Sequence, residues 1–480
     1  MNAFRSISPP SGPSRGRFTS RHKSPTKRTE HGARRPAWSR RPARPLWPAV
    51  PVRTFGRPPL PHLPPGDPVA VADVAEIRSR FPALQRRQAG HLAAYFDGPG
   101  GTQVPAVVVE AMADYLLHHN ANTHWAYATS AETDALLADA RSAVADFLGC
   151  GSDEVVFGAN MTTLTYHLSR ALGRGLEAAD EIVVTRLDHQ ANVAPWFDLA
   201  RERDLVVRAV PFDAATGRLD VDRYHELVGP RTRIVALGAA SNALGTVTEL
   251  EPLLEHASSA GAFTFVDAVH SAPHSLPDVH RLGCDAFACS PYKFYGPHLG
   301  ALFVKASRLA TLDVPRLPCA GDDGGERLET GTLPHEAMVG AGATVDFLAD
   351  LATGDQSEAP RRERLAHVFH ELEDRAATLL ERLWRGLEAI QAVTLYGPPP
   401  GTLRTSTLAF TVDGVPSDEV TRRLSDDDGV FTSHGDFYAS TVVEDLGLPA
   451  DGLVRAGVAI YTTAEEVDRL GRGVARIAAG

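Results

Sequence analysis

Short apolar runs alternate with segments of helical apolar spacing through the middle of the chain, and this alternation limits the possible folds more than any other feature. Runs typical of buried strands lie at residues 154–157, 181–185, 205–210, 233–237 and 263–266. Segments that we expect to be helical follow the first four runs, at residues 164–172, 193–203, 220–228 and 249–260. Such alternation builds βαβ units, so we predict an α/β fold with a mostly parallel, doubly wound sheet.

The pattern changes after about residue 340. A long helical stretch at residues 361–390 precedes a strand at 407–412, a helix from Asp418, an apolar run at 453–460 and a last helix from Ala464. We expect this part of the chain to form a smaller α+β domain.

The first 66 residues differ from the rest in charge. They carry 14 Lys and Arg against one acidic residue, and 14 of the 35 prolines, so we expect a disordered basic tail. Because the whole chain has a net charge of −11, residues 67–480 carry −24. The tail resembles a transit peptide in composition, could contact nucleic acid weakly, or could reflect a true start further downstream. We favour the last interpretation, and the acidic body argues against nucleic acid as a partner.

The cysteine content and the hydropathy of the chain indicate in which part of the cell the protein is expected to work. The four cysteines, Cys150, Cys284, Cys289 and Cys319, form no CxxC pair, which argues against a zinc site and a disulfide framework. No uncharged apolar run reaches 18 residues, so we expect no membrane span. We therefore expect a cytoplasmic protein with no metal and no membrane partner.

A lysine and an aspartate follow two of the apolar runs. Asp267 ends the run at 263–266, and Lys293 follows a second apolar strand that begins after Asp285. Ligands of open α/β sheets bind beyond the carboxyl ends of the strands, so both side chains are expected to face one crevice. A poorly hydrated lysine can hold the aldehyde of pyridoxal phosphate, and a carboxylate can keep its ring nitrogen protonated. Taken alone, Lys293 is better explained as a lysine that extends from a strand end to solvent. Asp267 alone could be a helix N-cap, which is common after a strand in α/β folds.

Two further positions fit the same cofactor. Thr162 and Thr163 lie at an expected strand-to-helix junction, where free N–H groups bind a phosphate, although simple capping explains them as well. His189 follows the run at 181–185 and could stack on a flat ring, although a lone loop histidine is more often solvated.

Together these segments resemble the class V aminotransferase-like enzymes, which use pyridoxal phosphate, and among them the cysteine desulfurase-like branch. Five motifs occur in the family's order over residues 70–480: Asp188-His-Gln-Ala-Asn192 with Pro195-Trp196, Val266-Asp-Ala-Val-His270, Ser290-Pro-Tyr-Lys293, Glu329-Thr-Gly-Thr332 and Val454-Arg455-Ala. The resemblance implies a type I pyridoxal-phosphate fold and a homodimer that acts on an amino acid. It also implies an N-terminal segment at 67–96 that packs with a small domain at 340–480, and a large cofactor-binding domain at 97–339.

The resemblance assigns roles at the cofactor ring and in catalysis. Lys293 would hold the aldehyde carbon and later move the α-proton, and Asp267 would pair with the ring nitrogen. His189 would stack on the ring, and His270 would hydrogen-bond the ring hydroxyl.

It also assigns roles at the phosphate and the substrate. Thr162, Ser290 and Tyr292 would hold the phosphate, together with Thr332 from the partner subunit. Arg455 would bind the substrate carboxylate, and Asn192 would lie beside the substrate.

The chain departs from the desulfurase pattern in its reactive loop. True desulfurases carry a nucleophilic cysteine where this chain has residues 429–439, which contain none. His270 and Tyr292 also replace the usual glutamine and histidine. We therefore expect C–S bond cleavage by β-elimination, with transamination or epimerisation as alternatives. A non-catalytic nucleic-acid-binding protein that uses the basic tail is the alternative from another class.

Overall fold

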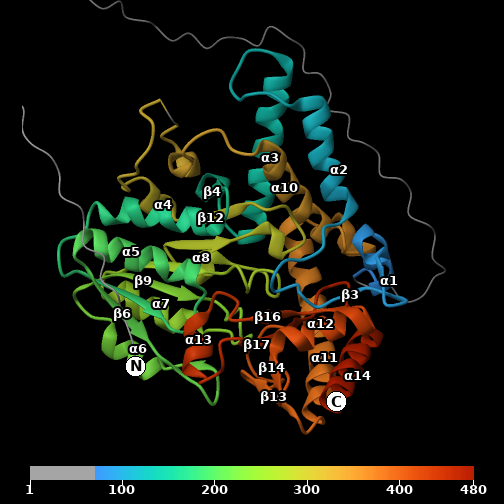
Figure 1. The fold of residues 1–480 in the computed structure, drawn as a ribbon. Helices are drawn as coiled ribbons and strands as arrows, with labels where there is room; N and C mark the ends of the chain where they lie inside the picture. The colour runs from blue at the N-terminus through green and yellow to red at the C-terminus, as the bar shows by residue number, and fades with distance from the viewer. Residues whose placement is uncertain (1–70, 320) are drawn as a thin grey trace, which may run out of the picture. The chain divides into compact units, whose positions relative to one another are not determined.

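The computed structural model describes residues 71–319 and 321–480 (Figure 1). The basic tail expected over residues 1–66 lies outside the described residues. No helix of the described part is long and apolar enough to cross a membrane.

A seven-stranded sheet forms the centre of the fold and has the order β4-β12-β11-β10-β9-β5-β6. Parallel pairing joins β6 to β5, β5 to β9, β9 to β10 and β10 to β11, whereas β12 runs antiparallel to both of its neighbours. This confirms the mostly parallel sheet that the sequence predicts. The strands are β4 (Val155–Gly158), β5 (Glu181–Thr185), β6 (Val206–Val210), β9 (Thr232–Gly238), β10 (Phe263–Asp267), β11 (Ala286–Cys289) and β12 (Gly300–Val304).

Helices cover both faces of this sheet, as neighbouring residues of one strand demonstrate (Figure 1). Phe265 packs in the cluster that contains Trp196 of α5, with the two rings 5.5 Å apart, whereas Val266 packs in the cluster on the opposite face. The sheet is therefore doubly wound. One face carries α4 (Met161–Gly173) and α5 (Ala194–Arg203), and the other carries α3 (Ala128–Leu148), α6 (Val221–Leu227), α7 (Leu250–Ser259) and α10 (His335–Ala349).

A second, antiparallel sheet of four strands has the order β13-β14-β17-β16 and a hydrophobic core of its own. Its strands are β13 (Val393–Tyr396), β14 (Thr407–Val412), β16 (Ser433–Gly435) and β17 (Leu453–Gly457), and its helices are α11 (Arg361–Glu388), α12 (Ser417–Asp428) and α14 (Ala464–Ala478). The last helix begins in a capping box, in which the Thr463 hydroxyl accepts the Glu466 N–H and the Glu466 carboxylate accepts the Thr463 N–H.

Short elements lie outside the two main sheets. β2 (His91–Leu92) and β3 (Ala94–Tyr95) come early in the described part, and β3 pairs in parallel with β15 (Val430–Phe431). Helix α2 (Ala106–Asp114) is continued by a π-helix, Tyr115–His119. The domain boundary expected at residue 340 falls inside α10. The remaining short elements are β1 (Arg87–Gln88), β7 (Phe212–Asp213), β8 (Arg218–Leu219), α1 (Val74–Ser79), α8 (Val279–Leu282), α9 (Ala306–Leu309) and α13 (Ser440–Asp445).

Candidate functional site

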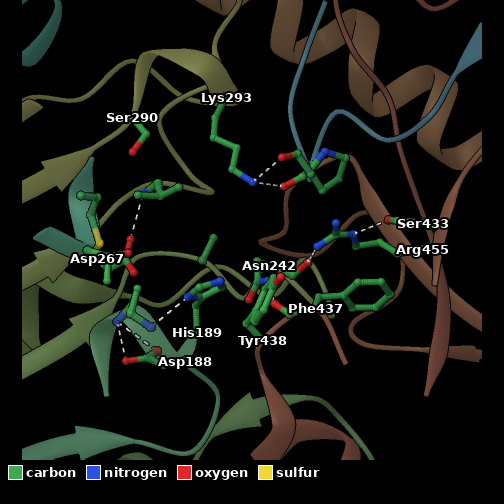
Figure 2. Close-up of a pocket in the computed structure, with 18 of the residues that line it drawn as sticks. Asp188, His189, Asn242, Asp267, Ser290, Lys293, Ser433, Phe437, Tyr438 and Arg455 are labelled. Carbon is green, nitrogen blue, oxygen red and sulfur yellow. Dashed lines mark hydrogen bonds between the residues drawn. The ribbon is translucent and has the colours of Figure 1, made fainter. Parts of the chain in front are cut away.

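A cavity of about 520 Å³ lies where β9, β10 and β11 end, and its opposite wall comes from β16, β17 and the segment after β16 (Figure 2). Seven of the site residues expected from the sequence line this cavity. They are Thr162, His189, Asp267, Ser290, Tyr292, Lys293 and Arg455. The carboxyl edge of the sheet therefore carries the site, as the rule for open α/β sheets predicts.

Lys293 ends a 3₁₀ turn that follows β11 and extends into the cavity (Figure 2). Its ammonium donates hydrogen bonds to the carbonyl oxygens of Pro99 and of Gly100, the latter at 3.1 Å. Burial is the main cause that lowers the pKa of the amine to about 8, and the positive charge of Arg455 is the second. Only four of the 48 basic residues of the sequence are lysines, and Lys293 and Lys305 are the two within the described part. A scarce residue type therefore occupies the centre of the cavity in a readily deprotonated form.

Asp267 is the last residue of β10 and is 8 % exposed. Its Oδ1 accepts the Val269 N–H at 3.0 Å, and no lysine or arginine of the described residues pairs with it. Burial raises the pKa of the carboxyl to about 6. A buried carboxylate without a cation would be stabilised by a ligand that brings a positive charge.

His189 has a defined tautomer, because its Nδ1 accepts the Ala191 N–H at 2.9 Å and the proton of a neutral ring must then lie on Nε2. Burial, followed by the charge of Lys293, lowers the pKa of the ring to about 4. The imidazole is therefore neutral at pH 7.

Asn192 does not lie where the resemblance placed it. It is fully buried and does not line the cavity. Its Nδ2 donates to the Asp188 carboxylate at 2.9 Å, and the same carboxylate accepts the Gly238 N–H at 3.1 Å. Asn192 thus supports the loop that carries His189.

Ser290 lies at the end of the cavity away from Arg455 (Figure 2), and the first turn of α4 also lines the cavity. Helix α4 begins at Met161, three residues earlier than expected, and the Asn160 side chain caps it by accepting the Thr163 N–H at 2.8 Å. Thr162 therefore lies in the first turn, where a backbone N–H has no helical partner. Ser290 is buried and lines the same cavity, and hydroxyl groups together with a helix N-terminus can hold a phosphate group.

Two further expected site residues, besides Asn192, lie outside this cavity. His270 is buried, and its Nε2 lies 3.2 Å from the Thr405 hydroxyl. Thr332 is exposed and lines a separate cavity together with Cys319. A role of Thr332 in the partner's cavity stays a prediction.

Arg455 lies on β17 at the other end of the cavity and is 4 % exposed (Figure 2). Its guanidinium donates to the Asn242 carbonyl oxygen at 2.8 Å and to the Ser433 hydroxyl at 3.2 Å, and lies 4.1 Å from the centre of the Phe437 ring. The Asp97 carboxylate is 3.5 Å away. The cation is held in place, yet its carboxylate partner is at the limit of hydrogen bonding, so an incoming carboxylate can compete for it.

Other residues of the cavity were not individually predicted from the sequence, and Asp97, Asn242 and Tyr438 are among them. Asn242 follows β9, and its Oδ1 is buried without a hydrogen-bond partner among the described residues. The rule that singled out Asp267, a polar residue just beyond the end of a parallel strand, would also have found Asn242.

Comparison with known proteins identifies the family. The family model described as aminotransferase class-V matches residues 94–470. The chain belongs to the class-V aminotransferase family. A probable cysteine desulfurase from Pseudomonas putida KT2440 is 32% identical over 82% of this chain and 95% of its own length. The aminotransferase-like protein FGM3 from Gibberella zeae is 30% identical over 83% of this chain and 96% of its own length.

Solved structures of similar fold agree with the assignment to this family. The apo structure of a cysteine desulfurase from Thermococcus onnurineus NA1 matches with a TM-score of 0.75 and 27% sequence identity. The match covers 85% of this chain and 98% of the desulfurase chain. The cysteine desulfurase CsdA from Escherichia coli gives a TM-score of 0.72 at 27% identity, with the same two coverages. Class-V aminotransferases depend on pyridoxal phosphate, and one structure of the same fold, C-DES, contains glycine covalently linked to that cofactor.

Proposed function

We propose that the protein is a pyridoxal-phosphate-dependent lyase that removes a sulfur substituent from Cβ of an amino acid by β-elimination. The observation that carries the proposal is the composition of the cavity. Lys293, Asp267 and Arg455 line it together, and no cysteine of the described residues does.

The residues fit the cofactor. Asp267 is a buried carboxylate that pairs with no lysine or arginine of the described part, and a protonated ring nitrogen would supply a positive charge. Thr162 and Ser290 would hold the phosphate, His189 would lie against the ring, and Lys293 would hold the aldehyde carbon. When bound, pyridoxal phosphate supplies a positively charged ring that accepts the electron pair left on Cα.

Arg455 orients the substrate. A carboxylate that replaces Asp97 at the guanidinium would make two charge-assisted hydrogen bonds. The Cα of the substrate would then lie between Arg455 and Lys293, because both side chains face the same cavity (Figure 2).

Lys293 moves the proton. Its neutral amine takes the proton from Cα, for which a pKa near 8 is suitable at physiological pH. The Cα–H and Cβ–S bonds break, a Cα=Cβ bond forms, and the sulfur leaves with its electron pair. The released enamine hydrolyses to pyruvate and ammonia, so the reaction needs no oxidant and no protein thiol.

The cysteines support elimination over persulfide formation. Cys284 and Cys289 are buried in the core, and burial raises the pKa of both thiols far above the usual range. Cys150 packs against the same core, and burial raises the pKa of its thiol to about 12. Cys319 is exposed but lines a different cavity.

Product analysis tests the proposal. The purified protein, loaded with cofactor, is incubated with L-cysteine, L-cystine and S-methyl-L-cysteine. Pyruvate and ammonia in equal amounts would support elimination. Alanine with a protein persulfide, a keto acid that retains its side chain, or a D-amino acid would each contradict it and indicate desulfuration, transamination or epimerisation.

We also propose that the protein acts as a homodimer in which Thr332 reaches the partner's phosphate site. The family resemblance and the exposure of Thr332 support this proposal. A mass of one chain in light scattering would contradict it.

A further inference from the structure

The segment after β16 has an unusual backbone. Phe437 and Tyr438 have φ angles of 55° and 58°, in the left-handed region that side chains other than glycine avoid. A glycine with positive φ, Gly435, lies only two residues before them. The chain therefore places two aromatic residues where glycine would fit without strain, and strain of this kind is typical of functional sites.

Contacts from separate elements hold this backbone in place. The Gln190 N–H donates to the Tyr438 carbonyl oxygen at 2.7 Å, and the Asn242 side chain donates to the Phe437 carbonyl oxygen at 2.8 Å. The Asp436 carboxylate accepts the Tyr438 N–H at 2.9 Å. The segment is thus fixed to both the β5 and the β9 loops.

This backbone directs the Tyr438 side chain to the cavity (Figure 2). Its ring centre lies 5.5 Å from that of His189, and the side chain is 72% exposed. A large aromatic ring at a cavity and open to water offers a surface that a ligand group can cover.

The charges beside Tyr438 favour one kind of ligand group. Asp436 lines the cavity, and its carboxylate forms no ion pair with any described lysine or arginine. Lys293 and Arg455 are the cavity's lysine and arginine, and the proposed function uses both, for the amine and the carboxylate of the substrate. A second anionic group would therefore meet Asp436 without a free lysine or arginine to balance it.

We propose that Tyr438 and Asp436 form the subsite for the Cβ substituent and select a neutral or cationic substituent over an anionic one. The proposal rests on the β-elimination proposed above. Tyr438 covers the substituent with its ring, where a cation also gains from the π face, and Asp436 repels a carboxylate.

Three S-substituted cysteines of similar size test the selection: S-(2-aminoethyl)-, S-(2-hydroxyethyl)- and S-carboxymethyl-L-cysteine. Pyruvate formation is followed at pH 8, where an imidazole in water is uncharged. We expect kcat/KM for the carboxymethyl compound to be lower by about tenfold or more, and Asp436→Asn to remove most of that difference. Equal rates for all three, or an unchanged ratio in D436N, would overturn the selection.

Variants at Tyr438 distinguish an effect on substrate binding from an effect on the stability of the fold. Tyr438→Ala should raise KM for the aminoethyl and hydroxyethyl compounds by about fivefold to tenfold, whereas Phe197→Ala, an exposed ring on α5, should not. Tyr438→Gly should weaken binding as much while keeping or raising Tm, because glycine adopts the left-handed backbone freely. A stable Y438G protein with an unchanged KM would overturn the role of the ring, and a fall in its Tm would contradict the backbone strain at this position.

The binding of compounds that have no leaving group measures the preference of the subsite independently of elimination. L-Lysine and L-2-aminoadipate have the shapes of the aminoethyl and carboxymethyl substrates with carbon in place of sulfur. Calorimetric titration of the cofactor-loaded protein should show tighter binding of L-lysine. Absence of pyruvate from every substrate, with this preference retained, would refute the elimination alone, whereas equal or reversed affinities would refute the subsite.

Discussion

Burial, and after it the positive charge of Arg455, holds the pKa of the Lys293 amine at about 8. The two side chains come from different sheets, Lys293 from the turn after β11 and Arg455 from β17. The group that would bind the substrate carboxylate therefore also helps to deprotonate the group that would take the α-proton.

Lys293→Ala should abolish the visible absorbance that bound pyridoxal phosphate gives. Lysine is scarce in this chain, and Lys305, an exposed residue, provides the matched control. Borohydride reduction followed by peptide mapping should label Lys293 in the unmodified protein. Label on another lysine, or unchanged absorbance in K293A, would contradict the assignment.

The uptake of cofactor by the apoprotein should depend on pH with a midpoint near 8. Only the neutral amine attacks an aldehyde, so the rate should rise by about tenfold per pH unit below the midpoint and level off above it. Replacing Arg455 by Gln removes a charge that lowers this pKa, so the midpoint should move to higher pH. A midpoint that stays in place in R455Q would contradict the electrostatic coupling.

Asp267→Asn should keep the fold and bind cofactor, but should lower kcat by about 10²–10³-fold, because the carboxylate that stabilises positive charge is lost. Steady-state pyruvate formation measures the effect. The exposed residue Asp222 on α6 supplies the control substitution. Activity of D267N close to that of the unmodified protein would show that the ring nitrogen needs no carboxylate here.

Cys319→Ser should leave turnover unchanged, because Cys319 lines a different cavity from Lys293. The assay compares kcat for pyruvate formation from L-cysteine before and after the substitution. An inactive C319S protein would instead support a persulfide mechanism.

Asp188→Asn should reduce the dependence of stability on pH. Burial raises the pKa of Asp188 to about 7, whereas a carboxyl of the unfolded chain ionises near pH 4. The unfolded state therefore loses its proton first, and the free energy of unfolding falls as pH rises from about 4 to 7. Urea titrations at pH 5 and pH 8 should show a smaller loss in D188N than in the unmodified protein. Equal losses would mean that the buried carboxyl does not titrate in this range.

The seven-stranded sheet was predictable because its strands are short, continuous apolar runs. The run at 181–185, for example, coincides with β5. Helix α10 was not predicted, since it is buried on most sides and has no clear polar face. Its glycines explain its composition, because a Cβ on Gly342 would lie 2.8 Å from Cα of Ala140 in α3.

The cofactor side of the cavity could be predicted more completely than the substrate side. Asp267 and Lys293 each follow an apolar run, so local pattern is sufficient to find them. Tyr438 and Asp97 reach the cavity only through tertiary contacts: β16 pairs with β17, and Asp97 bridges to Gly457. Elements of two or three residues have too few positions to show a period, so the sequence alone does not reveal them.

The cavity joins two parts of the molecule that have separate hydrophobic cores. A ligand that engages Lys293 and Arg455 at once would strengthen the coupling between the unfolding of these cores. A primary amine that lacks a carboxylate would react with the same site without adding this coupling. Calorimetric cooperativity would therefore distinguish ligands that span the cavity from ligands that occupy only one side of it.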